Sequence, residues 1–76
     1  MGTWHVTMQF RPGGPAVEGS WSDRAVALGK FRGWLGIHGS RDGVIIVLLE
    51  VEETVGEREP LRTWTKERGE VIHRVT

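Results

Sequence analysis

Apolar residues recur at intervals of three and four in one segment of this chain, and this spacing restricts the fold more than any other feature. The stripe consists of Trp21, Ala25, Leu28, Phe31 and Leu35. Residues spaced in this way share one side of an α-helix. Ser20 is a suitable N-cap with Asp23 three positions later, and Gly36 or Gly39 can end the helix. We therefore predict a helix from Ser20 to between Gly36 and Gly39, which must bury its apolar side against another element.

Most of the remaining apolar residues follow the pattern of β-strands. Residues 4–10 alternate strictly between apolar and polar, which indicates a half-buried strand with Trp4, Val6, Met8 and Phe10 on one side. The Pro- and Gly-rich residues 11–19 predict a mobile connection. Further strands are predicted at 44–53, 61–66 and 70–75, separated by a hairpin loop at 55–59 and a tight turn at 67–69. Gly69 is predicted at the left-handed position of that turn.

These elements predict a single α+β domain over residues 1–76. It has two layers, with one helix packed on a four-stranded, mostly antiparallel sheet, in the order strand–helix–strand–strand–strand. The first strand is expected to lie parallel to the second through a right-handed crossover. The chain contains no cysteine, and its 76 residues are close to the smallest size that one apolar core can stabilise, which favours a homodimer.

A register argument divides the last three strands into two faces. A three-residue turn at 67–69 would place Trp64 opposite Ile72, and the preceding hairpin would place Glu50 opposite Trp64. The face predicted to contact the helix contains Ile45, Val47, Leu49, Val51, Leu61, Thr63, Thr65, Val71, His73 and Val75. The opposite face would combine charged residues with Val44, Ile46, Leu48, Trp64 and Ile72, an apolar patch that needs a cover.

That outer patch gives the functional hypothesis, a non-catalytic protein-interaction module that self-associates through the outer sheet face or through its edge strands. Trp and Arg are frequent at binding hot spots. The predicted partner-binding residues are Ile46, Leu48, Arg62, Trp64, Ile72 and Arg74. The alternative is a single-stranded nucleic-acid-binding domain, in which an aromatic ring stacks on bases and cations hold phosphates. Its residues would be Arg62, Trp64, Lys66 and Arg74.

Composition and spacing give no motif for catalysis, for a metal or for a cofactor. The three histidines have no metal-ligand spacing, and the closely spaced His38, Ser40 and Asp42 are poorly placed to form a hydrolytic triad. Ten basic residues balance ten acidic ones, which argues against a strong field for nucleic acid. The longest apolar run, at 44–49, is far too short to span a membrane. We expect a cytoplasmic protein, and the Arg- and Gly-rich composition suggests a bacterial or phage source.

Overall fold

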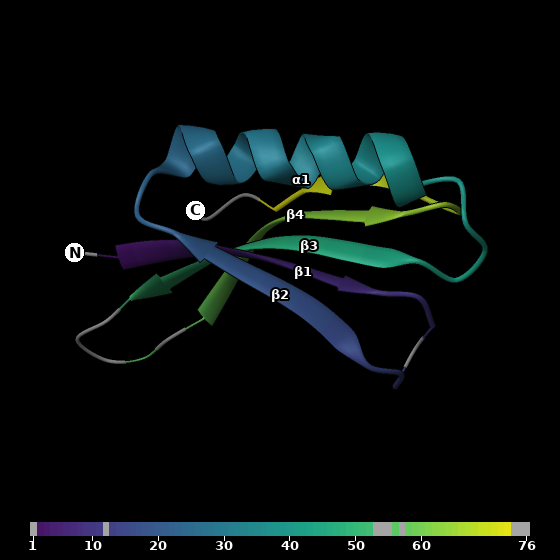
Figure 1. Cartoon of the computed structure of the whole chain (residues 1–76), viewed down its shortest axis with the longest axis horizontal. Coiled ribbons are helices and arrows are strands. Elements are labelled where there is room, and N and C mark those ends of the chain that lie inside the picture. Colours follow the sequence, from purple (N-terminus) through teal and green to yellow (C-terminus); the bar gives the residue numbers. More distant parts are fainter. Residues whose placement is uncertain (1, 12, 53–55, 57, 74–76) are drawn as a thin grey trace.

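The computed structural model describes residues 2–11, 13–52, 56 and 58–73. Within these residues the chain forms one helix and one five-stranded antiparallel sheet, with the helix lying across one face of the sheet (Figure 1). The elements are β1 (Gly2–Gln9), β2 (Ala16–Trp21), α1 (Arg24–His38), β3 (Ile45–Glu52), β4 (Arg58–Thr65) and β5 (Gly69–Ile72). The α+β class and the helix-on-sheet architecture are therefore confirmed, whereas the four-stranded sheet is corrected to five strands.

The additional strand, β2, lies within the segment that we predicted as a mobile connection. It pairs antiparallel with β1, with Met8 opposite Val17 and Trp4 opposite Trp21. The turn before it includes a hydrogen bond from Gly14 N to Arg11 O, and Gly13 has a φ of 75°. Ala16–Trp21 has little strand propensity, and this edge strand forms because β1 supplies its hydrogen-bonding partners.

Because β2 includes Ser20, the helix begins later than predicted. Asp23 is the N-cap, and its Oδ1 accepts hydrogen bonds from the backbone N–H groups of Ala25 and Val26 at 2.8 and 3.3 Å. Such a cap satisfies two of the N–H groups that a helix leaves unpaired in its first turn. The helix ends at His38 with Gly39 as its C-cap, within the predicted range.

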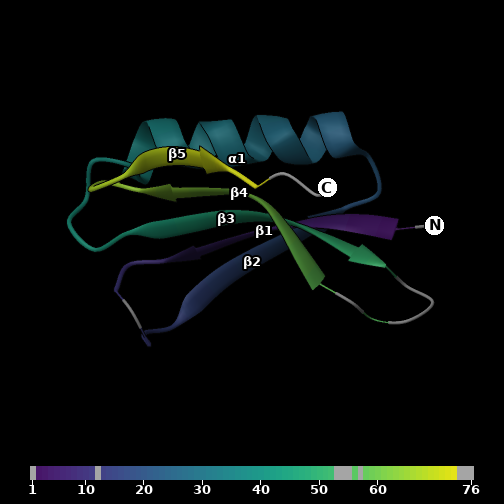
Figure 2. The same ribbon diagram turned by 180° about the vertical axis from the view of Figure 1, so that it is seen from behind.

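The strand order is β2-β1-β3-β4-β5. β1 lies between β2 and β3 and is antiparallel to both, so the predicted parallel pairing of β1 with β3 is wrong. The parallel relation holds instead between β2 and β3, which α1 connects across β1. The turn before β5 has Gly69 at a φ of 72°, as the sequence predicts, and β5 lies at the sheet edge seen in front in Figure 2.

The face that contacts α1 is the opposite of the one predicted for β3, β4 and β5. Val6 and Met8 of β1 are buried there, as expected, but they lie opposite Leu48 and Ile46. The buried core consists of Val6, Met8, Ala27, Phe31, Val44, Ile46 and Leu48. The alternation of side chains between two faces was largely predicted correctly, because Ile46 and Trp64 share a face across β3 and β4. The predicted pairs are wrong, since Trp64 lies opposite Ile46 and Glu70 and not opposite Glu50 and Ile72. Leu61, which was predicted on the other face, packs against the core. The prediction placed the wrong face of the sheet beneath the helix.

The other face of the sheet carries the apolar stripe of β3, Ile45, Val47, Leu49 and Val51, and these side chains are half-buried although no helix covers them. Arg58 of β4 donates a hydrogen bond to the Glu18 carboxylate of β2, although β1 and β3 separate these two strands. The sheet therefore coils, so that β2 and the beginning of β4 approach each other on this side. A register shift between Leu48 and Leu49 increases the local twist of β3 and β4.

The side chain of Trp64 connects β4 to the end of the helix through a hydrogen bond. Its indole N–H donates a hydrogen bond to the carbonyl oxygen of Gly39 at 2.9 Å, and its ring packs against the core. Gly39 is buried, and a Cβ at this position would lie 2.9 Å from Trp64 Nε1 and 2.4 Å from Leu35 O. Glycine is thus required here by the close approach of the helix end and the Trp64 ring.

We expect Gly39→Ala to lower the free energy of unfolding by about 1–3 kcal/mol, the usual effect of overpacking. The substitution must displace either the last helical turn or Trp64. Urea unfolding followed by tryptophan fluorescence measures the loss. Gly33→Ala is the matched control, since nothing lies within 4 Å of a Cβ at that position. Equal stability of the Gly39→Ala variant and the native protein would show that the Trp64 contact is not formed.

Candidate interaction surfaces

The structure separates the six predicted partner-binding residues. Ile46 and Leu48 are buried beneath α1, with 0 % and 1 % of their surface exposed, so the prediction that they lie on an uncovered face is wrong. Trp64 is half-buried in the packing just described. Ile72, at the free edge β5, keeps 55 % of its surface exposed. Arg74 lies outside the described residues.

Of the predicted basic residues, the two that the structure describes, Arg62 and Lys66, are engaged in ion pairs. Arg62 Nη1 lies 3.1 Å from Glu70 Oε2, on neighbouring strands. Lys66 Nζ lies 2.7 Å from Asp42 Oδ1, and this hydrogen bond, reinforced by the ammonium charge, holds the pKa of Asp42 below its ordinary value. The nucleic-acid alternative therefore gains no support, because Arg62 and Lys66 each have a carboxylate partner and the Trp64 ring packs beside the helix.

A different surface emerges where α1 runs beside the edge strand β2. Trp21 of β2 and Trp34 of α1 meet edge to face, with ring centroids 6.4 Å apart, so this side of the helix borders β2. The Trp21 ring lies over Gly19, where a Cβ would be 2.4 Å from the Trp21 ring. The two tryptophans thus fill the space between β2 and the helix and form the base of this surface.

Exposed apolar side chains surround the two tryptophans. Val26 and Ile37 are eleven positions apart, about three helical turns, so they lie on the same side of α1. Val17 projects from β2 on the helix side, opposite the buried Met8. Phe10 meets His38 edge to face at 5.8 Å, at the end of the helix. We call this surface the β2–α1 flank, defined by Phe10, Val17, Val26 and Ile37, which are 41 %, 49 %, 45 % and 72 % exposed.

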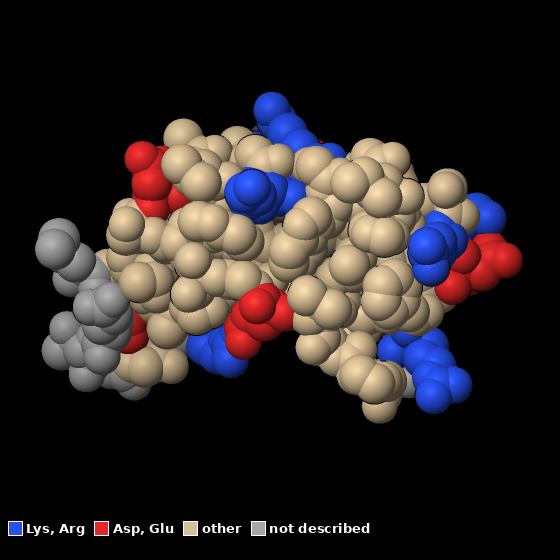
Figure 3. All heavy atoms as spheres, in the orientation of Figure 1, with Lys and Arg blue, Asp and Glu red and all other residues tan. Residues whose placement is uncertain are grey.

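The side of the molecule that carries β2 and α1 is mostly uncharged. In Figure 3 the surface over these elements consists largely of neutral side chains, and the charged groups form small separate clusters. The carboxylate of β2, Glu18, is turned to the other face of the sheet, where it binds Arg58 and lies 3.3 Å from His5 Nδ1. The free edge of β2 therefore presents backbone groups and apolar side chains without an unpaired acidic group.

The side of α1 that faces away from the core contains three glycines. Gly29, Gly33 and Gly36 lie on the side away from the core, and a Cβ at any of them would meet no atom within 4 Å. Packing within the described part of the chain therefore does not explain these glycines. The basic residues Lys30 and Arg32 border them and form no ion pair within the described residues.

Sequence reasoning missed the β2–α1 flank because it assigned residues 11–19 to a loop. Val17 had no predicted element, and Val26 and Ile37 lie outside the apolar stripe that predicted the helix. The signal present in the sequence was the Pro-Gly-Gly turn at 12–14, which can join two antiparallel strands.

Comparison of the chain with protein-family models, with curated proteins and with solved structures gave no significant match. In the described residues, no helix is long and apolar enough to cross a membrane. Those same residues contain no group of three or more His, Cys, Asp or Glu side chains placed to hold a metal ion.

Proposed function

We propose that this protein is a non-catalytic interaction module that self-associates as a homodimer through the β2–α1 flank. The observation that carries the proposal is the gathering of four exposed apolar side chains beside an edge strand. Ile37, the most exposed of them, leaves 72 % of its surface in water. Several exposed apolar side chains on one side of a small protein are typical of a contact site.

The free edge of β2 supports the same surface. An edge strand exposes unpaired backbone N–H and C=O groups, and proteins that remain monomeric usually block such edges with Lys, Pro or an inward-pointing charge. Ala16–Trp21 contains none of these, since its one charged residue, Glu18, is held by Arg58. A second copy of β2 could pair with it antiparallel about a two-fold axis and extend the sheet.

The small size of the core gives a reason for association. In the described residues, seven side chains form the buried core. A domain of this length buries a smaller fraction of its surface than a larger one and is correspondingly marginal. Burial of Val17, Val26 and Ile37 against a second copy would add apolar contacts that one chain cannot make alone.

Sedimentation velocity at protein concentrations below and above the micromolar range tests the proposal. We expect a monomer–dimer equilibrium in the native protein and a monomer in the double variant Val17→Lys, Ile37→Glu. Both side chains are exposed, so the fold should persist, which circular dichroism can verify. Ile72→Glu is the matched control: it places a charge at an exposed apolar position on the opposite edge and should leave association unchanged. A native protein that stays monomeric throughout would refute the proposal.

A further inference from the structure

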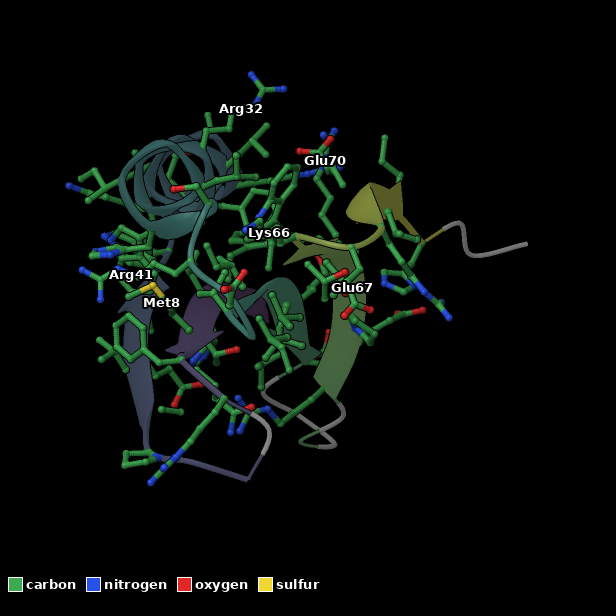
Figure 4. The ribbon with its side chains drawn as sticks, turned by 90° about the vertical axis from the view of Figure 1, so that its right-hand side faces the viewer. Met8, Arg32, Arg41, Lys66, Glu67 and Glu70 are labelled. Carbon is green, nitrogen blue, oxygen red and sulfur yellow. The ribbon has the colours of Figure 1, made fainter. Side chains whose placement is uncertain are left out.

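A cavity of about 390 Å³ opens on the sheet face that α1 does not cover, at the end where β3 begins and the β4–β5 turn lies. Its volume is at the lower end of the range for small-ligand sites. Ile45 of β3, Thr63 and Thr65 of β4, and Val71 of β5 line it, together with His73. Figure 4 views this end of the sheet, with Lys66 and Glu67 on the turn at the end of β4.

The cavity has an apolar floor. Ile45 and Val71 come from the β3 and β5 strands on either side of β4. Val71 keeps 38 % of its surface exposed, so the side chains of the described residues do not fill the cavity. An apolar group of matching size would remove this surface from water, which is the main source of affinity in such sites.

Hydrogen-bond donors predominate among the polar groups around this floor. The oxygen of Thr65 accepts a hydrogen bond from the backbone N–H of Arg68 at 3.3 Å, so its own hydroxyl proton remains available to donate. Thr63 Oγ1 and His73 Nε2 are 2.8 Å apart, and this pairing orients the imidazole at the side of the cavity.

The two cations at the cavity differ in their availability. Lys66 is bound to Asp42, whereas Arg68 forms no ion pair within the part of the chain that the structure describes. A guanidinium offers paired N–H donors that match the two oxygens of a carboxylate. Glu67, beside it, repels anions and would limit the number of negative charges that the cavity accepts.

We propose that this cavity binds a small amphipathic monocarboxylate, with its hydrocarbon body on Ile45 and Val71 and its carboxylate at Arg68. The volume corresponds to about a dozen water molecules at ~30 Å³ each, so the ligand is small. The hydroxyl of Thr65 can donate a second hydrogen bond to the carboxylate. The site does not depend on the proposed dimer, because β2 lies at the opposite edge of the sheet.

Titration of the ¹⁵N-labelled protein with phenylacetate, followed by amide chemical shifts, tests this site. The neutral isostere phenylacetamide is titrated in parallel. We expect saturable shifts at Ile45, Thr65 and Val71 with phenylacetate, and at least about fivefold weaker binding of the amide. Shifts confined to the β2–α1 flank, equal affinity for the two probes, or no saturation would overturn the proposal.

Two charge substitutions at the rim make the test specific. Arg68→Gln should weaken phenylacetate binding about fivefold or more, because it removes the guanidinium that is proposed to hold the carboxylate. The backbone hydrogen bond from Arg68 to Thr65 does not depend on the side chain and is retained. Glu67→Gln should leave the affinity unchanged or increase it, since a repelling charge is removed. Arg24→Gln is a remote control with the same change of charge as Arg68→Gln. If Arg68→Gln binds as the native protein does, or if Arg24→Gln weakens binding equally, the carboxylate is not recognised at Arg68.

Discussion

Leu48→Ala is expected to lower the free energy of unfolding by about 2–5 kcal/mol, whereas Leu49→Ala should lower it by about 1 kcal/mol. The two leucines are neighbours in β3 and have the same chemistry. Leu48 is 1 % exposed and belongs to the core beneath α1, while Leu49 is half-buried on the opposite face, where part of the removed surface is already in contact with water. Truncation at Leu48 therefore leaves a cavity that the surrounding core can fill only in part.

This pair of substitutions tests the face assignment directly, because the sequence-based register predicts the reverse order. Urea unfolding of the two variants and the native protein, monitored by circular dichroism, gives both values. The native protein must be measured at several concentrations, since a dimer that dissociates on unfolding makes the transition concentration-dependent. A larger loss at Leu49 than at Leu48 would show that the helix covers the other face of the sheet.

Replacing Gly29, Gly33 and Gly36 together with alanine is expected to raise the free energy of unfolding by about 2–3 kcal/mol. Each glycine is exposed within a helix, and each lacks a neighbouring atom within 4 Å of the Cβ position, so alanine introduces no collision. Glycine in a helix lowers the free energy of unfolding by about 1 kcal/mol relative to alanine, chiefly because glycine loses more conformational entropy than alanine when the chain folds. For a domain of this size the melting temperature should rise by on the order of 10 °C.

Differential scanning calorimetry measures this increase, and the three single variants show whether the contributions add. Positions three and four apart on one helix face can interact, so a sum that falls short by a few tenths of a kcal/mol is expected. Gly39→Ala, at the end of the same helix, is expected to lower the free energy of unfolding and therefore serves as the contrasting variant. A decrease in melting temperature for the triple variant would mean that the outward side of α1 has contacts that the described structure does not contain.

Much of the local structure could be predicted from the sequence. The stripe from Trp21 to Leu35 located the helix, although Trp21 itself lies in β2, and the strict alternation at residues 4–10 located β1 and its buried side. The left-handed glycine of the β4–β5 turn was also predicted. β2 was missed because a short edge strand containing glycine has a weak local pattern and is stabilised by its partner.

The candidate site was less predictable, since it depends on relations between elements that are distant in the sequence. Val17 and Ile37 are twenty residues apart, and they share a surface only because α1 runs beside β2. The cavity likewise requires β3, β4 and β5 to be placed side by side. The predicted patch around Leu48 and Trp64 was a correct grouping of residues, but the structure places α1 on it.

The sequence by itself determined that this chain has one helix and several strands, and how most side chains of each strand are partitioned between its two sides. A period of two fixes that partition, because alternate side chains of a strand point to opposite sides. Only the tertiary structure decided which face becomes the core. Residues 44–49 are apolar at every position, so both faces of β3 could accept the helix. The hairpin of β1 with β2 and the connection of α1 across β1 resolve this, by placing Ile46 and Leu48 beside Met8 and Val6.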